Sequence, residues 1–316
     1  MSSYAHYAST DGAELVYQSH GESSQLSSRA APPQVLLLLH GFTGSSQYFA
    51  RNFDALSQHY WVVAPDLRGH GLSTKSEYGY HVARLAVDLY SLIRHIRVTH
   101  SQATFVAVGC SLGAAILWTY AELFDSKDFA GMIFVDQAPL QDYIPEDGWT
   151  ELYGNYGCHD AKSLAAAQRS LVDTPETFYR GLVAECLAYR YRPDSVLPPS
   201  EAEVHADEAF FVDISRQGDK HWFSKLLANH TSYDHRSTLG HRLEIPCCVM
   251  AGEYSGCFPL AGIAATTSLI NARRPGQAQT MTIRSGHCTL CCSGTTARKE
   301  LSLHCRDVLR AIRNLE

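Results

Sequence analysis

The sequence predicts an α/β fold, in which a doubly wound, mostly parallel sheet carries an inserted helical cap. The first observation is a series of apolar runs without alternation, such as residues 35–39 and 104–108, typical of strands buried on both faces. The second is that helix-like stretches separate these runs, as in a sheet built by right-handed crossovers. The third is a break in this rhythm at residues 140–240, which are helix-like throughout and indicate the cap.

The individual elements follow in chain order. Two short strands are expected at residues 5–9 and 14–17, with Asp11-Gly12 turning between them. Further strands are expected at residues 35–39, 61–64, 104–108, 132–135, 246–251 and 280–283, and helices at residues 46–59, 79–95, 112–124, 261–271 and 296–315. We therefore assign residues 1–139 and 241–316 to the core domain and residues 140–240 to the cap.

Composition and charge exclude several classes of function. The 316 residues are 45% hydrophobic and 18% charged, which suits one large globular domain with an insertion. The formal net charge is -6 and no basic stripe is present, so we expect no nucleic-acid partner. Because no apolar stretch approaches the roughly 18 residues of a membrane helix and no secretory pattern is found, we expect a cytoplasmic protein without membrane association.

The ten cysteines are expected to be reduced thiols, because no export pattern accompanies them. Cys288, Cys291 and Cys292 resemble half of a metal site, but no second pair of ligands lies at a suitable spacing. We therefore expect neither a metal nor a cofactor.

The strongest motif is Gly109-Cys110-Ser111-Leu112-Gly113, which follows an apolar strand and precedes a helix. A sharp strand-to-helix turn forces the central residue into a strained conformation, and the two glycines relieve the crowding. The hydroxyl of Ser111 is then exposed above the sheet, where the helix N-terminus favours developing negative charge. Ser111 is therefore the candidate nucleophile.

A second motif, His40-Gly41-Phe42, directly follows the third predicted strand. A loop at this place aims a backbone N–H at the site above Ser111, so the amides of Phe42 and Leu112 are expected to form an oxyanion hole. Gly41 is expected to contact the substrate, and His40 is interpreted as a structural residue.

A third motif, Ser285-Gly286-His287, comes just beyond the last predicted strand. A histidine at this place is the last member of a triad in chain order. Its position selects His287 from the 16 histidines of the chain as the candidate general base.

These motifs resemble those of the α/β-hydrolase superfamily. Residues 66–73, DLRGHGLS, are similar to the D-x-R-G-x-G-x-S segment of its esterase, lactonase, haloperoxidase-like and dehalogenase branches. The resemblance covers nearly the whole chain outside the cap and implies the fold more specifically than the substrate. The segment itself is interpreted as a structural turn that ties a strand to the core.

The sequence departs from the superfamily where the triad acid is expected. The resemblance implies an Asp after the next-to-last strand, but Ser255 holds this position and Glu253 is two residues out of register. Asp136 is the better candidate, because it ends the strand that follows the nucleophile helix, beside the elbow. Haloalkane dehalogenases and some lactonases resemble this arrangement. We expect Asp136 to accept a hydrogen bond from Nδ1 of His287, the alternative being an Asp that caps a loop.

Serine as nucleophile favours acyl transfer, whereas dehalogenation and epoxide opening need a carboxylate. The first expectation is hydrolysis of a carboxylic ester or lactone of a small, apolar or aromatic molecule through an acyl-enzyme on Ser111. A biosynthetic thioesterase or acyl cyclase and a receptor with little turnover stay open as alternatives. The expected partner is a small-molecule ester, lactone or thioester, and a homodimer is left open.

The predicted cap is rich in aromatic residues, of the kind that line pockets for apolar ligands. We name Trp149, Tyr153 and Trp222 in the cap as candidates for substrate binding, together with Tyr254 and Phe258 in the loop after the next-to-last strand. The alternative is that these side chains pack the cap helices together.

Overall fold

The computed structural model describes residues 3–21, 33–187, 200–283 and 285–287, and its framework is an eight-stranded sheet. The strands are β1 (Ser3–Ala8), β2 (Glu14–His20), β3 (Gln34–Leu39), β4 (Trp61–Pro65), β5 (Thr104–Cys110), β6 (Phe129–Val135), β7 (Cys247–Gly252) and β8 (Ala278–Ile283). Their order across the sheet is β1-β2-β4-β3-β5-β6-β7-β8. The β1–β2 and β2–β4 pairs are antiparallel and all other pairs are parallel, which confirms the predicted fold class.

The burial of the strands explains why their sequences do not alternate. Every residue of β4 and β7 is buried, and so is every residue of β3 after Gln34. Such strands are covered on both faces and therefore read as continuous apolar runs. The β1–β2 hairpin lies at the edge of the sheet, and its turn uses Gly12 at φ 81°, a conformation that glycine adopts without steric cost.

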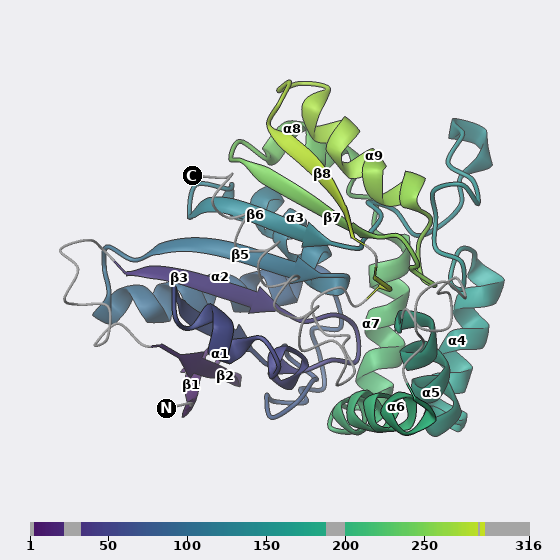
Figure 1. Cartoon of the computed structure of the whole chain (residues 1–316), viewed down its shortest axis with the longest axis horizontal. Helices are drawn as coiled ribbons and strands as arrows, with labels where there is room; N and C mark the ends of the chain where they lie inside the picture. The colour runs from purple at the N-terminus through teal and green to yellow at the C-terminus, as the bar shows by residue number, and fades with distance from the viewer. Residues whose placement is uncertain (1–2, 22–32, 188–199, 284, 288–316) are drawn as a thin grey trace.

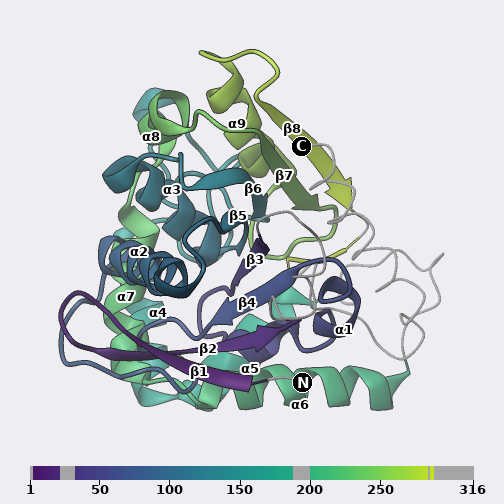
Figure 2. The ribbon, with the colours of Figure 1, turned by 90° about the vertical axis from the view of Figure 1, so that its left-hand side faces the viewer.

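Helices cover both faces of the sheet. The helices α2 (Val82–Thr99), α3 (Leu112–Phe124), α8 (Arg236–Arg242) and α9 (Leu260–Asn271) pack side by side on one face, and α1 (Phe53–Leu56) lies on the other (Figure 2). The continuous helix expected at residues 46–59 is wrong: the structure has a 3-10 turn, η1 (Ser46–Phe49), followed by the short α1. The backbone amides of Ala50 and Asn52 donate to Gln47 and Phe49, each three residues earlier, so the chain makes 3-10-type turns here in place of a continuous α-helical ladder.

A second group of helices lies across the carboxyl ends of the parallel strands (Figure 1). It comprises α4 (Ala161–Asp173), α5 (Pro175–Cys186), α6 (Glu201–Arg216) and α7 (Lys220–Ser232), which follow β6 and a short 3-10 turn, η2 (Pro145–Asp147). Within this group α4 packs against α7 and α5, and α5 packs against α6. These helices thus cover the edge of the sheet at which β5 and β6 end.

None of the helices in the described ranges is both long and apolar enough to cross a membrane. The helix expected at residues 296–315, and Cys288, Cys291 and Cys292, lie outside the described residues.

The segment at residues 66–73 forms a buried turn between strand and core. Both carboxylate oxygens of Asp66 accept backbone hydrogen bonds, from Ser46 at 2.6 Å and from Leu72 at 2.7 Å. The fully buried guanidinium of Arg68 forms two hydrogen bonds with the carboxylate of Asp88. These interactions satisfy charges that would otherwise be costly to bury, and they fit a structural role for the segment.

Candidate active site

Ser111 occupies the sharp turn between β5 and α3. Its backbone lies at φ 51° and ψ -116°, a strained conformation for a residue with a side chain. A Cβ at Gly109 would lie 2.5 Å from the carbonyl of Gly113, and one at Gly113 would lie 2.5 Å from the carbonyl oxygen of Leu39. Only glycine fits at these two positions, so the motif dictates the elbow through steric exclusion.

The loop after β3 approaches the elbow closely. A Cβ at Gly41 would stand 3.3 Å from the Cβ of Ser111, so the backbone here passes directly beside the hydroxyl. At the N-terminus of α3 the amide of Leu112 has no acceptor within its helix. Within the described ranges no acceptor is found for this amide or for that of Phe42, so both donors have the bonding capacity that an oxyanion hole requires.

His40 fixes this loop as a neutral imidazole. The amide of Leu67 donates to its Nε2 at 3.0 Å, so the ring proton is on Nδ1, which donates to the carbonyl of Gly41 at 2.8 Å. Burial lowers the pKa of His40 to about 4, and the hydrogen bond to Gly41 and the charge of Asp66 only partly oppose this effect. His40 thus holds the backbone that leads into Phe42.

Asp136 and His287 are in contact at the carboxyl edge of the sheet. Asp136 directly follows β6, and its Oδ1 lies 2.7 Å from Nδ1 of His287. The hydrogen bond expected from the sequence is therefore present in the structure. Asp136 itself adopts a positive φ of 49°, and its side chain is completely buried.

Ser255 belongs to this network, although the sequence suggested only that it replaces an acid. Its hydroxyl donates to Oδ1 of Asp136 at 2.7 Å, and the amide of Gly252 donates to Oδ2 at 2.6 Å. A Cβ at Gly252 would stand 2.9 Å from the same carboxylate. The end of β7 and the loop after it thus supply two donors where the superfamily resemblance implies the acid, and the carboxylate that they bind directly follows the neighbouring strand β6.

Burial and charge shift the pKa values of this cluster. Burial raises the pKa of Asp136, while the hydrogen bonds from His287, Ser255 and Gly252 oppose the effect. Burial alone would lower the pKa of His287, but the neighbouring Cys257 and Asp136 outweigh it and hold that pKa well above its ordinary value.

The thiol of Cys257 responds to the same surroundings. Its hydrogen bond with Cys186 lowers the pKa of Cys257 to about 6; burial opposes this effect and the charge of His287 adds to it. Cys257 therefore belongs to the electrostatic environment of the imidazole.

The hydroxyl of Ser111 donates to Oε1 of Gln137 at 3.2 Å rather than to His287. Gln137 directly follows Asp136, and its Nε2 donates to the carbonyl of Ala138 at 2.9 Å, which leaves Oε1 as the acceptor for the serine. The structure therefore holds Ser111 in a rotamer directed at the end of β6.

Ser111 and His287 face one cavity of about 360 Å³, a size suited to a small ligand. Much of its wall is apolar or aromatic, from the loop after β3, helices α5 and α7, and the loop after β7: Phe42, Tyr48, Phe178, Leu182, Leu227 and Phe258. Gln141, Asn155, Glu185 and His230 add polar groups. Of the residues proposed from the sequence to bind substrate, the structure places Gly41 and Phe258 in this wall.

The structure does not bring Trp149, Tyr153, Trp222 or Tyr254 to this wall. Trp149 is buried, donates to the carbonyl of Leu140 at 3.2 Å and stacks on Tyr153 with ring centroids 4.8 Å apart. Trp222 is buried against Gly69, where it packs α7 onto the turn at residues 66–73. Tyr254 is tied by its backbone amide to Ser285. Packing between segments thus occupies the side chains of Trp149, Tyr153 and Trp222.

Sequence reasoning missed Gln137, Cys186 and Cys257, which all lie at the site. Gln137 was within reach of inference, because it follows Asp136 at the same strand end. Cys257 lies two residues beyond Ser255 in the loop singled out for its missing acid. Nothing in the sequence pointed to Cys186, which approaches Cys257 across 71 residues of chain.

The family model of the alpha/beta hydrolase fold matches residues 34–290, so the chain belongs to this family. Two solved structures illustrate the likeness. An esterase from Exiguobacterium antarcticum superposes with a TM-score of 0.77 at 15% identity, covering 98% of this chain and 99% of that one. An enol-lactonase from Burkholderia xenovorans LB400 gives 0.72 at 16% identity, covering 98% and 100%. At such identities the likeness shows the fold alone.

Curated relatives match over shorter stretches. The chain is 40% identical over 80 residues to 2-(acetamidomethylene)succinate hydrolase from Mesorhizobium japonicum, covering 25% of this chain and 27% of that protein. It is 29% identical over 100 residues to a soluble epoxide hydrolase from Corynebacterium sp., covering 32% and 33%. The chain thus spans about a third or less of the length of these two relatives.

Proposed function

We propose that this protein hydrolyses a carboxylic ester or lactone of a small, apolar or aromatic molecule through an acyl-enzyme on Ser111. The observation that carries the proposal is the juxtaposition of Ser111, on a strained elbow, with the Asp136–His287 pair at one cavity. A nucleophile, a base and the group that orients the base are the elements that such acyl transfer requires.

In the proposed reaction the hydroxyl oxygen of Ser111 attacks the acyl carbon and transfers its proton to His287. The accepting atom is Nε2, because Nδ1 is bonded to Asp136. The amides of Phe42 and Leu112 donate to the carbonyl oxygen as it becomes an oxyanion. His287 then gives its proton to the departing alkoxide, and a water molecule releases the acid by the same steps in reverse roles.

The proposed first step requires Ser111 to leave Gln137. A rotation about the Cα–Cβ bond of Ser111 exchanges the hydrogen bond to Gln137 for one to Nε2 of His287. Such a change is ordinary, since catalytic hydrogen bonds often form only once substrate is bound.

The chemistry of the nucleophile and the cavity wall favour this substrate class. Epoxide hydrolysis by this fold family uses a carboxylate nucleophile, so Ser111 argues against an epoxide even though one relative is an epoxide hydrolase. The apolar wall near Phe178 and Leu182 suits an aliphatic or aromatic acyl group. Esterase and lactonase neighbours are consistent with this choice without identifying the substrate.

Covalent labelling with a fluorophosphonate probe tests the nucleophile. We expect a single adduct on Ser111, seen by peptide mass spectrometry and absent in Ser111→Ala. An adduct that persists in this variant would refute the assignment.

Turnover of a panel of p-nitrophenyl esters, lactones and acyl thioesters tests the reaction. We expect esters or lactones to be hydrolysed and Ser111→Ala to lose the activity. Thioester turnover that exceeds ester turnover would instead favour the thioesterase alternative. Tight ligand binding without turnover would favour a receptor.

A further inference from the structure

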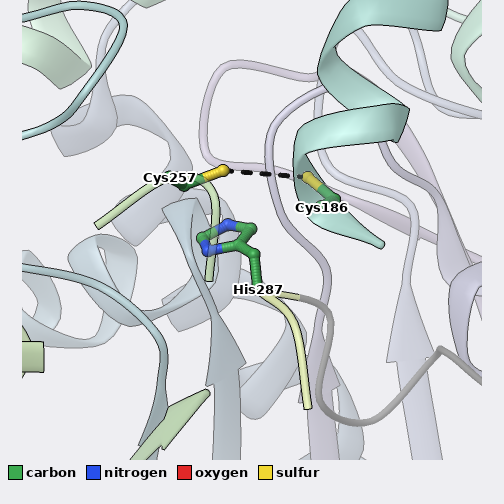
Figure 3. Close-up of side chains that lie close together, drawn as sticks. All are labelled: Cys186, Cys257 and His287. Atoms are coloured by element: carbon green, nitrogen blue, oxygen red, sulfur yellow. Dashed lines mark hydrogen bonds between the residues drawn. The ribbon is translucent and has the colours of Figure 1, made fainter. Parts of the chain in front are cut away.

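Three side chains of metal-binding type meet at the cavity wall (Figure 3). Cys186 is the last residue of α5, Cys257 lies in the loop after β7, and His287 follows β8. One ligand atom from each residue lies within 4.8 Å of the other two. The two sulfur atoms are 3.9 Å apart, well beyond the roughly 2.05 Å of a disulfide bond.

The spacing of these atoms is close to that of a tetrahedral zinc site. Bonds of about 2.3 Å to sulfur and about 2.0 Å to nitrogen, at tetrahedral angles, separate the ligand atoms by about 3.5 to 3.8 Å. The sulfur atoms of Cys186 and Cys257 already stand at 3.9 Å. The three ligand atoms lie within 4.8 Å of one another, so small side-chain rotations that move them by about an ångström bring them to these separations.

Hydrogen bonds orient His287 and Cys257, as outer hydrogen bonds orient the ligands of zinc sites. Nδ1 of His287 is bonded to the carboxylate of Asp136, which leaves Nε2 as the coordinating atom. Zinc-bound histidines almost always donate their other ring N–H in this way, to a carboxylate, a backbone carbonyl or water. The hydroxyl of Ser255, itself bonded to Asp136, accepts hydrogen bonds from the amides of Cys257 and Phe258, both at 3.3 Å. One network thus positions two of the three ligands.

We propose that Cys186, Cys257 and His287 bind one zinc ion, which inhibits the hydrolase reversibly. On binding, each thiol loses its proton to solvent and Nε2 of His287 donates its lone pair. Three protein ligands leave a fourth position for water on the side of the cavity. A bound ion also joins α5 to the core loops across the cavity.

Only the inhibition rests on the proposed function of the site. When Nε2 of His287 shares its lone pair with zinc, that lone pair is no longer available to accept the proton of Ser111. A chain with zinc bound at this site therefore cannot turn over substrate. The binding of the metal depends on the three ligands alone.

The first test is titration of the full-length chain with Co²⁺ in the presence of a phosphine reductant, which keeps the thiols reduced. We expect the absorption spectrum of tetrahedral cobalt with thiolate-to-cobalt charge transfer. This spectrum should saturate at one equivalent of Co²⁺ per chain, and Zn²⁺ should displace the cobalt. Outer-shell changes cost about 10–100-fold in metal affinity, so Cys186→Ser and Cys257→Ser should each weaken this site by about 100-fold or more.

Cys158→Ser is the matched control, because Cys158 lines the same cavity outside the cluster. It should retain the cobalt spectrum with its affinity within about threefold. The proposal is overturned if the wild-type chain gives no thiolate–cobalt spectrum. It is also overturned if Cys186→Ser retains that spectrum, or if Cys158→Ser loses it.

The second test follows ester turnover with equimolar Zn²⁺ and then with excess chelator. We expect Zn²⁺ to remove at least nine-tenths of the activity and the chelator to restore it. In Cys186→Ser, with turnover measured against its own metal-free rate, the Zn²⁺ concentration needed for inhibition should be about 100-fold higher. Unchanged turnover in metal-loaded protein would overturn the inhibition. Cobalt binding in a protein without any turnover would refute the proposed function and leave the metal site standing.

Discussion

At the scale of single residues, the candidate site depends on the hydrogen bonds that the Asp136 carboxylate accepts. Its Oδ1 is shared by His287 and Ser255, and its Oδ2 accepts from the amide of Gly252. The imidazole is therefore held in one tautomer, with Nε2 free of the carboxylate. Ser255 supports the acid without carrying a charge.

Asp136→Asn should lower kcat by about 10³ to 10⁴, because a neutral amide neither fixes the tautomer nor stabilises the imidazolium. The free energy of unfolding should change far less than this loss implies, since the amide fills the same space. Steady-state turnover of the best ester, together with denaturant unfolding of both proteins, measures the two effects.

Ser255→Ala is the matched control for the acid. It removes one of three donors to the carboxylate, and a hydrogen bond to a charged group contributes about 1.5–3 kcal/mol, so kcat should fall by about 10- to 150-fold at most. A larger loss in Ser255→Ala than in Asp136→Asn would show that Asp136 is not the triad acid.

At the scale of elements, different contacts determine the elbow at Ser111 and the group of helices α4 to α7, which the sequence predicts as a cap. The elbow is determined by backbone contacts, because α3 packs so tightly on β3 and β5 that Gly109 and Gly113 admit no side chain. The cap helices are placed by side-chain packing, which determines which of their aromatic residues reach the cavity.

Gly113→Ala should destabilise the protein by about 1–3 kcal/mol, because its Cβ would meet the carbonyl oxygen of Leu39 at 2.5 Å. Gly181→Ala, in α5, is the control: its Cβ meets nothing within 4 Å, and alanine stabilises a helix by about 1 kcal/mol over glycine. Denaturant unfolding compares the two. Shifts of the same sign would contradict the steric account of the elbow.

Phe178→Ala should shift the acyl preference towards longer chains, because Phe178 lines the cavity from α5. Added room in an apolar pocket discriminates between acyl chains of different length by about 1–3 kcal/mol. The ratio of kcat/KM for octanoate to acetate esters should therefore rise by about tenfold or more. Phe210→Ala is the control, since Phe210 is a cap phenylalanine outside this wall that packs on Phe211. A change of equal size in both variants would mean that the cavity does not bind the acyl group.

At the scale of the whole molecule, several histidines are buried as neutral rings. Burial lowers the pKa of His235 to about 3, with a further lowering by His230, and burial lowers that of His40 to about 4. In the unfolded chain these groups titrate near pH 6.5. Between 6.5 and the folded values the unfolded state binds more protons, so stability is complete above pH 6.5 and decreases as the pH falls.

Each such histidine should lower the free energy of unfolding by up to about 1.4 kcal/mol for every pH unit below pH 6.5. His235→Phe retains an aromatic ring against Trp118. Between pH 6 and 5 it should reduce the slope of the unfolding free energy against pH by about 1.4 kcal/mol per pH unit, which corresponds to one bound proton. Urea unfolding at several pH values measures this slope. His221→Phe, at an exposed position of α7, should leave it unchanged; an unchanged slope in His235→Phe would contradict the account.

The sequence by itself determined the sheet, the elbow and the position of Asp136. Apolar runs and the glycines Gly109 and Gly113 are local properties, because backbone sterics and the burial of strands act over a few residues. Parallel strands end at one edge, so the sequence predicts the end of β6 near Ser111, and the structure pairs β6 with β5. The same reasoning failed at residues 46–59, where backbone hydrogen bonds between residues three apart divide the expected helix.

Only the tertiary structure decided which cap residues meet the cavity and what surrounds His287. The rotation of a helix about its axis depends on packing against distant segments, so Phe178 of α5 faces the cavity while Trp222 of α7 does not. Ser255 and Cys257 reach Asp136 and His287 through a loop whose course no local pattern specifies. Contacts between residues far apart in the chain are set by the packing of whole elements, and the sequence carries no periodicity from which to deduce them.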